Sequence, residues 1–591
     1  MKRAIQRLTE RNPNPATGEA HYYLGLAFLF QERNIEAFAA FYKATWNYEW
    51  RSAAYYRLAC LDARRGRWSH ALDHIDRSLA TNSDHLHARG LRSAILRRIG
   101  RPGEALAKAS SAVSNDPLDF LSRFELLLLE GLTPESAAQR LAQQTNMDRQ
   151  LHLDLASDYA AAGLFAEASA LLLCVTSDPS ASTYPMVYYF LAYLAEQQGD
   201  LDLAVKHRTL AASASPDYCF PSRLEEMIAL EDAQDAPDRN PADAKAAYYL
   251  GNLYYDKKRY EDAISLWEKS VALDAGFSIP WRNLGIAYFN IHHSAERALD
   301  AYERALLANP GDARLVYELD QLRKRTGVPP IERLAFLEKR SDLITQRDDL
   351  TVELITLYNQ IGQPGKALEI LGGRRFHPWE GGEGLVSGQY AWAHRLLGIW
   401  CLNHRDYAGA MEHFNAARTY PHNLGEGKHL LTQELDLDYF CGVALRELGR
   451  DEMARNSFRS AADSEPASPW MCYYKIMALR SLGMTSAAAE VIREMTQRLD
   501  AQRKSEPRID YFATSLPNFL VFEDDLALRK EIECAFTEAL LELALGNELP
   551  AGRKLQLVVD MDPNNLAAQT LLAQLGPTGD RVIESASWLA K

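Results

Sequence analysis

Residues 247–275 read AYYLGNLYYDKKRYEDAISLWEKSVALDA, and the spacing of small and large residues in this stretch decides the fold. The pattern predicts two antiparallel helices joined by the charged turn DKKR, without the alternation typical of a strand. Gly251 and Ala263 would lie where the helices cross, which lets the two backbones approach closely. Tyr254 and Trp267 would fill the space beside that crossing. Such a hairpin cannot bury its apolar face alone, so we expect it to stack on similar hairpins.

The stretch resembles the tetratricopeptide consensus, a helical hairpin of about 34 residues. The same register recurs along the chain. Small or apolar residues at consensus position 8 mark it at Gly25, Ala59, Ser93, Ala156, Ala192, Gly251, Gly285, Ile355, Gly398, Gly442 and Ile476. Alanines at position 20 accompany most of these markers, at Ala37, Ala71, Ala105, Ala168, Ala204, Ala263, Ala367, Ala410, Ala454 and Ala488. The resemblance implies an all-α protein, a right-handed α-solenoid of about a dozen hairpins.

The quality of the repeats predicts three arrays along the chain. Residues 1–147 form an N-terminal array, and residues 148–345 a central array with degenerate repeats. Residues 346–591 form a C-terminal array with inserted loops.

Several stretches are more distinctive than the repeat itself. They are YYRLACLDARRGRW (55–68), NSDHLHARGLRSAILRRIGR (82–101), RRFHPWEGGEG (374–384), YPHNLGEGK (420–428) and SLPNFLVFEDDL (515–526). These stretches are similar to one bacterial family of uncharacterised tetratricopeptide-repeat proteins, whose longer members carry an N-terminal β-rich region with a carbohydrate-related character. The resemblance implies that this chain is a fragment or a short member, and it implies no catalytic residue.

Composition excludes some classes of protein. The net charge is −14, and the acidic majority argues against nucleic acid, although residues 1–100 are basic. No run of about 18 apolar residues is present, so we expect no membrane insertion. The polar N-terminus lacks the core of a secretory signal, which predicts a cytoplasmic protein. The seven cysteines include no C-x-x-C pair, and we expect them to be reduced and unpaired.

Three insertions interrupt the C-terminal repeats, and each follows the second helix of a hairpin. All three therefore leave the same edge of the solenoid, and the first two loops, residues 374–384 and 420–428, can touch. The third insertion contains Phe519, Phe522, Glu523, Asp524 and Asp525. Polar and aromatic residues of the first two loops are candidate ligand-binding residues: Arg375, His377, Trp379, Glu380, Glu383, His422 and Glu426.

Three interpretations of these loops are open. Trp379 could provide a platform and the three glutamates could accept hydrogen bonds from hydroxyls, oriented by Arg375 and His377. Alternatively, Trp379 fills a gap between repeats and the carboxylates cap helix N-termini. A glycosidase-like carboxylate pair is the third interpretation. The six histidines between residues 377 and 429 show no metal-ligand spacing, and we expect no metal and no cofactor.

A row of tyrosines is expected on the concave face. Consensus position 5, which points into the groove, is occupied by Tyr22, Tyr56, Tyr189, Tyr248, Tyr439 and Tyr473. Tyrosine rings of this kind suit an extended peptide or a sugar chain. The alternative is that the rings pack between adjacent repeats.

The leading functional prediction is a non-enzymatic scaffold that binds a protein or peptide segment, by analogy with the fold. The alternative is a carbohydrate-linked binding or accessory module with its ligand site at the inserted loops. A third possibility is a helical enzyme that uses the loop carboxylates.

Overall fold

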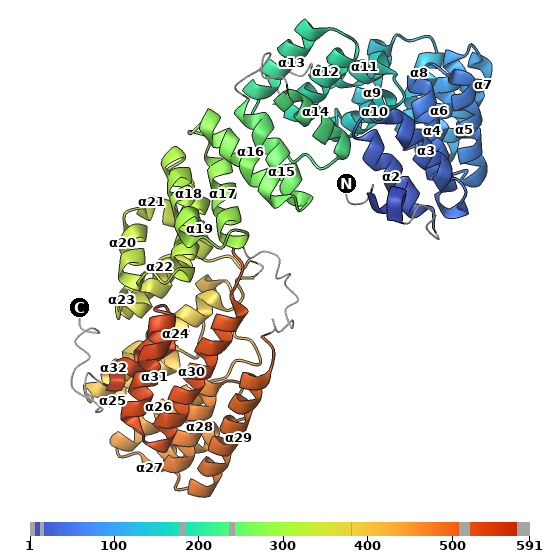
Figure 1. Cartoon of the computed structure of the whole chain (residues 1–591). Helices are drawn as coiled ribbons and strands as arrows, with labels where there is room; N and C mark the ends of the chain where they lie inside the picture. Colours follow the sequence, from blue (N-terminus) through green and yellow to red (C-terminus); the bar gives the residue numbers. More distant parts are fainter. Residues whose placement is uncertain are drawn as a thin grey trace. The chain divides into compact units, whose positions relative to one another are not determined.

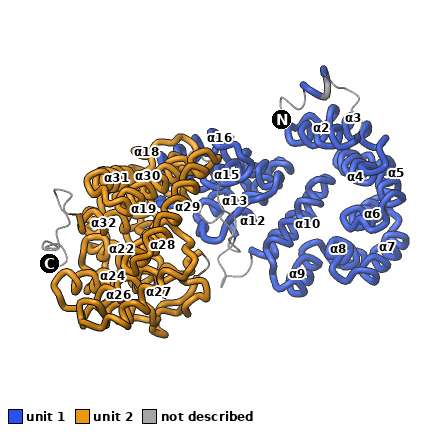
Figure 2. The backbone as a smooth tube through the Cα atoms, turned by 90° about the horizontal axis from the view of Figure 1, so that it is seen from below, with its two compact units in different colours: residues 1–280 blue, residues 281–591 orange. Residues whose placement is uncertain are grey.

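The computed structural model describes residues 6–11, 17–176, 184–235, 243–379, 381–507 and 521–575, and throughout these ranges the regular structure is helical without a strand. Consecutive helices pack as antiparallel hairpins, and hairpin stacks on hairpin (Figure 1). The fold is therefore an all-α solenoid, as predicted. It divides into two compact units, residues 1–280 and 281–591, which are described separately below (Figure 2).

Unit 1 begins with a π-helical turn, η1 (Arg7–Arg11), and continues as helical hairpins. Its helices are α2 (Glu19–Leu29), α3 (Asn34–Ala44), α4 (Tyr48–Arg64), α5 (Trp68–Thr81), α6 (Leu86–Arg98), α7 (Pro102–Asn115), α8 (Phe120–Leu129), α9 (Pro134–Gln144), α10 (Arg149–Ala161), α11 (Phe165–Leu173), η2 (Cys174–Thr176), α12 (Pro185–Gln197), α13 (Leu201–Ser213), α14 (Leu224–Asp235), α15 (Ala244–Asp256) and α16 (Tyr260–Leu273).

The boundary between the units falls within α17 (Ser278–Asn290). Unit 2 continues with α18 (Ala295–Ala308), α19 (Ala313–Arg325), α20 (Pro330–Glu338), α21 (Ser341–Ile344), α22 (Asp348–Gln360), α23 (Pro364–Gly373), α24 (Leu385–Asn403), α25 (Tyr407–Ala416), η3 (His422–Leu424), α26 (Leu435–Glu447), α27 (Asp451–Asp463), α28 (Pro469–Ser481), α29 (Thr485–Lys504), α30 (Leu526–Leu545), α31 (Glu548–Met561) and α32 (Leu566–Leu575).

Several hairpins, α15/α16 and α24/α25 among them, are held by a glycine on the first helix and an aromatic ring on the second. A Cβ atom added at Gly251 would lie 2.6 Å from Trp267, and one added at Gly398 would lie 2.3 Å from Phe414. A buried alanine completes each crossing, as Ala410 does beside Gly398. These contacts confirm the predicted register, because the small residues stand where the backbones approach most closely.

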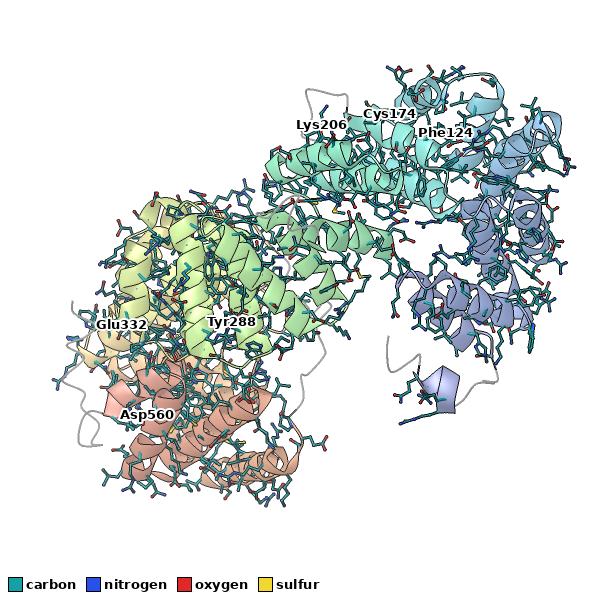
Figure 3. The ribbon with its side chains drawn as sticks, turned by 45° about the horizontal axis from the view of Figure 1, so that its top comes forward. Phe124, Cys174, Lys206, Tyr288, Glu332 and Asp560 are labelled. Carbon is teal, nitrogen blue, oxygen red and sulfur yellow. The ribbon has the colours of Figure 1, made fainter. Side chains whose placement is uncertain are left out.

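The sequence markers miss two hairpins. The first is α8/α9, where Phe124 of α8 (labelled in Figure 3) is buried and packs edge-on against Tyr159. In the second, α19/α20, a buried ion pair joins the helices. Arg333 Nη2 lies 2.5 Å from Asp320 Oδ2, and it also donates to Glu353 Oε2 at 2.9 Å. Charged residues at such positions do not resemble the consensus, which is why the sequence pattern fails here.

Helix ends follow ordinary capping chemistry. The side chains of Asp148 and Ser468 accept hydrogen bonds from backbone N–H groups in the first turns of α10 and α28. The turn between α26 and α27 contains Gly449 with a φ of +74°, a conformation that costs glycine little. Such local signals help to fix where these helices begin and end.

In each unit, the curvature of the array brings helices that are distant in the sequence into contact. In unit 1, Arg64 of α4 donates to Gln197 Oε1 of α12 at 2.8 Å. In unit 2, Arg333 Nη1 donates to Asn564 Oδ1 at 2.6 Å, and Gln360 Nε2 donates to the Asn564 carbonyl at 2.6 Å. The last hairpin therefore packs against α20 and α22, a closure that a regular repeat does not predict.

All seven cysteines are unpaired, which confirms the prediction; six are buried, and Cys174 (labelled in Figure 3) is half-buried. None of the helices that the structure describes combines the length and apolar character needed to cross a membrane.

Candidate binding site

The two inserted loops of unit 2 meet, as predicted. Phe376 N donates to the Asn423 carbonyl at 2.8 Å, and Asn423 Nδ2 donates to the carbonyls of Leu371 and Arg374 at 2.6 and 2.9 Å. The Phe376 ring is buried. A Cβ atom at Gly425 would lie 2.5 Å from the Phe376 carbonyl oxygen, so glycine permits the close approach of the two loops.

One of the three predicted carboxylates caps a helix. Glu426 Oε2 accepts hydrogen bonds from Gly384 N at 2.9 Å and from Ser387 Oγ at 2.8 Å. Gly384 is the N-cap of α24, where free N–H groups and the helix dipole favour a negative charge. For Glu426 the structure therefore shows the capping alternative.

The other predicted loop residues are more open to solvent. His377 is held through its backbone N, which donates to Asp348 Oδ2 at 2.8 Å, and its side chain remains 77% exposed. Trp379 is half-buried, with its ring over Gly382, where a Cβ atom would lie 2.0 Å from it. The remaining predicted side chains are exposed, namely Arg375, Glu383 and His422. Glu380 lies outside the described residues, and ligand binding by this loop set stays a prediction.

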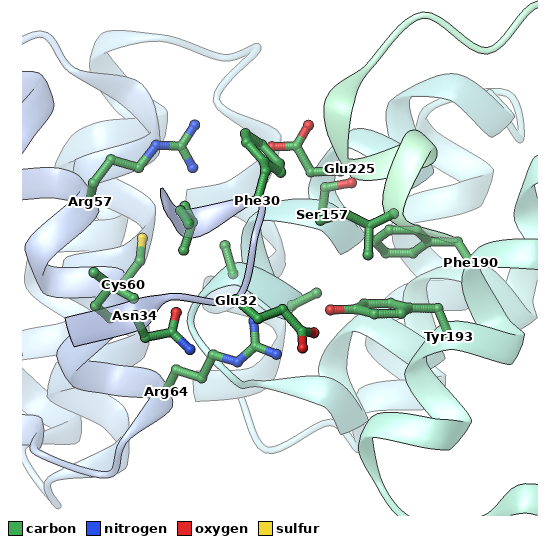
Figure 4. A pocket seen from close by; sticks show the side chains of 15 residues that line it. Phe30, Glu32, Asn34, Arg57, Cys60, Arg64, Ser157, Phe190, Tyr193 and Glu225 are labelled. Atoms are coloured by element: carbon green, nitrogen blue, oxygen red, sulfur yellow. The ribbon is translucent and has the colours of Figure 1, made fainter. Parts of the chain in front are cut away.

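A groove inside unit 1 is the more developed concave site. A cavity of about 420 Å³ lies between α2, α4, α10 and α14. It adjoins a second, more apolar pocket, which is shown in Figure 4. Both are lined by Phe30, Arg57, Ser157 and Glu225, so the two pockets are adjacent, and together they are here called the unit 1 groove. The groove exists because α4 and α10 pack across the inside of the curled array.

The wall of the groove is apolar on the side formed by α12. Phe190 and Tyr193 enter from this helix and face Cys60 and Arg64 of α4 (Figure 4). Burial raises the pKa of the Cys60 thiol to about 12. The thiol is therefore neutral near pH 7 and is a poor nucleophile, which suits a binding surface better than a catalytic one.

The other end of the groove is polar. Tyr56 OH donates to Asp158 Oδ1 at 3.1 Å, and His87 Nδ1 lies 2.7 Å from Asp158 Oδ2. The hydrogen bond with Asp158 raises the pKa of His87. Burial, together with the neighbouring His87, lowers the pKa of His85, whose ring packs 5.0 Å from Tyr56. Three helices, α4, α6 and α10, thus contribute to one hydrogen-bonded cluster.

Arg57 is the cation between these two ends. Its side chain is half-buried in the groove, and its Nε is buried without a hydrogen-bond partner in the part of the chain that the structure describes. Among the same residues it forms no ion pair, whereas Arg223 at the rim pairs with Asp154 Oδ2 at 2.7 Å. A half-buried cation with unused donors is suited to bind an anionic group.

The predicted row of tyrosines divides into two sets. Tyr22 and Tyr56 line the unit 1 groove. The others pack among the repeats, which is the alternative that the sequence left open. Tyr189 is fully buried and donates to Asp243 Oδ2 at 2.9 Å, and Tyr248 packs 5.0 Å from Phe277. In unit 2, Tyr473 is buried and Tyr439 is half-buried against Phe458.

Three residues of the groove, Arg57, His87 and Asp158, could not be identified from the repeat register. Tyr56 and Asp158 are 102 residues apart, and only the curling of unit 1 brings them together. The repeat register places each of these residues on its own helix. It carries no information about which helices meet across the groove.

Comparison with known proteins identifies the repeat. Tetratricopeptide-repeat family profiles match residues 2–48, 56–120 and 244–277. Tetratricopeptide repeats are therefore present near the beginning and near the end of unit 1. The chain is 29% identical over 102 residues to a peroxisomal targeting signal receptor of Candida albicans; this match covers 17% of each protein.

Two solved structures align with parts of the chain. The crystallised tetratricopeptide-repeat domain of P58(IPK) aligns with 74% of this chain and 99% of that domain, at 16% identity and a TM-score of 0.21. YrrB, described as a tetratricopeptide-repeat protein with an unusual peptide-binding site, aligns with 41% of this chain and 94% of its own, at 14% identity and a TM-score of 0.15. These likenesses are weak and identify no partner.

Proposed function

We propose that this protein is a non-enzymatic scaffold that binds a segment of another protein in the unit 1 groove. The observation that carries the proposal is Arg57, a half-buried cation in the groove without an ion pair among the described residues. Glu225, which lines the same groove, stabilises the Arg57 charge, but the buried Nε lacks a hydrogen-bond acceptor, and an unsatisfied buried donor is costly. A bound carboxylate would offset that cost.

The groove suits an extended peptide that carries an acidic group. Its volume of about 420 Å³ is within the range of ligand sites. Leu29 and Phe30, which are half-buried, offer an apolar surface for a side chain, and Arg57 offers donors for a carboxylate. The cluster of Tyr56, His87 and Asp158 offers polar contacts beyond it. The ligand we infer therefore has an apolar residue close to an acidic one.

The more specific predictions, about a carbohydrate ligand, the cellular location and the inserted loops, are not supported by the similar proteins. The carbohydrate-linked alternative, and with it the bacterial family with a β-rich region, has no support in the matches described above. A cytoplasmic location and ligand binding by the loops of residues 374–384 and 420–428 stay predictions.

The test starts from a phage-displayed library of random peptides selected on the full-length chain. The affinities of enriched peptides are then measured by fluorescence polarisation. Arg57→Gln should weaken binding by about 10- to 100-fold, as expected for the loss of a charge-assisted hydrogen bond. Arg65→Gln is the matched control, because Arg65 follows the same helix and is exposed. Equal affinity for Arg57→Gln and wild-type chains would refute the proposal.

A further inference from the structure

A short segment of unit 2, residues 521–525, lies on an edge formed by two helix C-termini. Asn290 is the last residue of α17, and Arg325 is the last residue of α19. Asn290 Nδ2 donates to the Val521 carbonyl at 3.0 Å, and Glu523 N donates to Asn290 Oδ1 at 3.0 Å. One side-chain amide therefore binds the backbone of the segment on both sides of Phe522.

Phe522 anchors the segment. Its side chain is 1% exposed, and its ring packs edge-on against Phe289 at 5.3 Å and tilted against Tyr302 at 5.6 Å. The Arg325 guanidinium lies 5.9 Å from the centre of the same ring, and Arg325 Nη2 donates to Asp524 Oδ1 at 3.2 Å. The edge thus has an aromatic pocket and a cation beside it.

These contacts are those of a captured peptide rather than of packed helices. The backbone clamp by Asn290 does not depend on the sequence of the segment, and a single aromatic side chain fills the pocket. Glu523, Asp524 and Asp525 are all exposed, and Asp524 pairs with Arg325. A few anchor residues and a backbone clamp are the usual means by which a surface recognises a linear motif.

We propose that this edge, formed by the C-terminal ends of α17 and α19, is a second peptide-binding site. Its ligand is a linear segment with an aromatic residue followed two positions later by an acidic residue. The chain's own residues 521–525 occupy the site in cis, and a partner protein with the same motif competes with them. The inference concerns unit 2 and is independent of the unit 1 groove.

The cis segment is a strong competitor. It runs directly into α30, whose N-cap is Asp525, so the segment is held close to the site. Short tethers give effective concentrations of about a millimolar or more. A peptide in trans should therefore bind the wild-type chain weakly, and weakening the cis segment should expose the site.

The test uses a fluorescein-labelled peptide with the sequence of residues 520–527, LVFEDDLA. Fluorescence polarisation should show at least about tenfold tighter binding to full-length Phe522→Ala than to the wild-type chain, because the aromatic pocket is vacated. Adding Asn290→Ala should abolish that gain, and the peptide LVAEDDLA should bind neither chain. A folded Phe522→Ala chain that binds no better than wild type would overturn the proposal, and so would a gain that survives Asn290→Ala.

A milder variant decides the question if Phe522→Ala does not fold. Asp524→Arg replaces the ion pair with Arg325 by a repulsion but leaves the aromatic anchor in place. It should increase the affinity for the peptide several-fold relative to Glu523→Arg, the matched control, whose exposed side chain lies one residue away. Equal affinities for these two variants would overturn the proposal.

Discussion

Gly398→Ala tests one of the helix crossings at which a glycine faces an aromatic ring. The added methyl group would lie 2.3 Å from Phe414 Cε1, well inside van der Waals contact. Phe414 is fully buried and stacks on Phe440 at 5.3 Å, so its ring cannot turn aside without disturbing the next hairpin. The substitution must therefore displace either the ring or helix α25.

The expected magnitude follows from two opposing terms. Overpacking a core costs about 1–3 kcal/mol. Replacing glycine by alanine inside a helix stabilises that helix by about 1 kcal/mol. We therefore expect the free energy of unfolding to fall by up to about 2 kcal/mol. Gly388→Ala is the matched control, because Gly388 lies in the same helix and nothing stands within 4 Å of its added Cβ. It should be neutral or stabilising by up to about 1 kcal/mol.

The assay is urea unfolding of the full-length chain followed by far-ultraviolet circular dichroism. Hydrogen–deuterium exchange would locate the loss, which should be confined to α24, α25 and their neighbours, since each repeat contacts only adjacent ones. Phe414→Leu should partly rescue Gly398→Ala by making room for the methyl group. Identical shifts for the Gly398 and Gly388 variants would refute the reasoning.

Three further predictions follow from the described contacts. Arg333→Met should lower the free energy of unfolding by about 3–5 kcal/mol in urea titrations, because Asp320 would be left buried and unpaired; a change below 1 kcal/mol would contradict this. Trp379→Ala should destabilise by about 2 kcal/mol, since its half-buried ring packs over Gly382, but should leave the affinity of groove-selected peptides unchanged. The hydrogen bond with Asp158 raises the folded-state pKa of His87 above its usual 6.5. The stabilisation of the fold by this contact is therefore fully present below pH 6.5 and is lost as the pH rises through the folded-state pKa. As the pH rises above 6.5, amide hydrogen exchange in α6 and α10 should therefore accelerate by more than the intrinsic, base-catalysed increase in the exchange rate. The His87→Ala variant should not show this additional acceleration.

The local packing could be predicted from the sequence because it depends on residues a few turns apart. Gly398 and Ala410 mark one crossing, and both occupy the predicted places. The contact between the inserted loops was also predictable, because they leave consecutive hairpins on the same edge. The α19/α20 hairpin was not, since Asp320 and Arg333 replace the small residues of the consensus with a buried ion pair.

The unit 1 groove could not be predicted for a different reason. Arg57 and Asp158 become neighbours of one cavity only after several hairpins have stacked with small, cumulative rotations. The sequence of a single repeat does not determine the total rotation, and so it does not show which helices meet across the groove. The same holds for the segment around Phe522, which reaches α17 across more than two hundred residues of intervening chain.

The most direct test of the proposed function is hydrogen–deuterium exchange of the full-length chain with and without a peptide selected from the phage library. We expect protection in α2, α4, α10 and α14, the helices between which the unit 1 groove lies. Protection confined to the loops of residues 374–384 and 420–428 would contradict it and would place the binding site at the inserted loops instead.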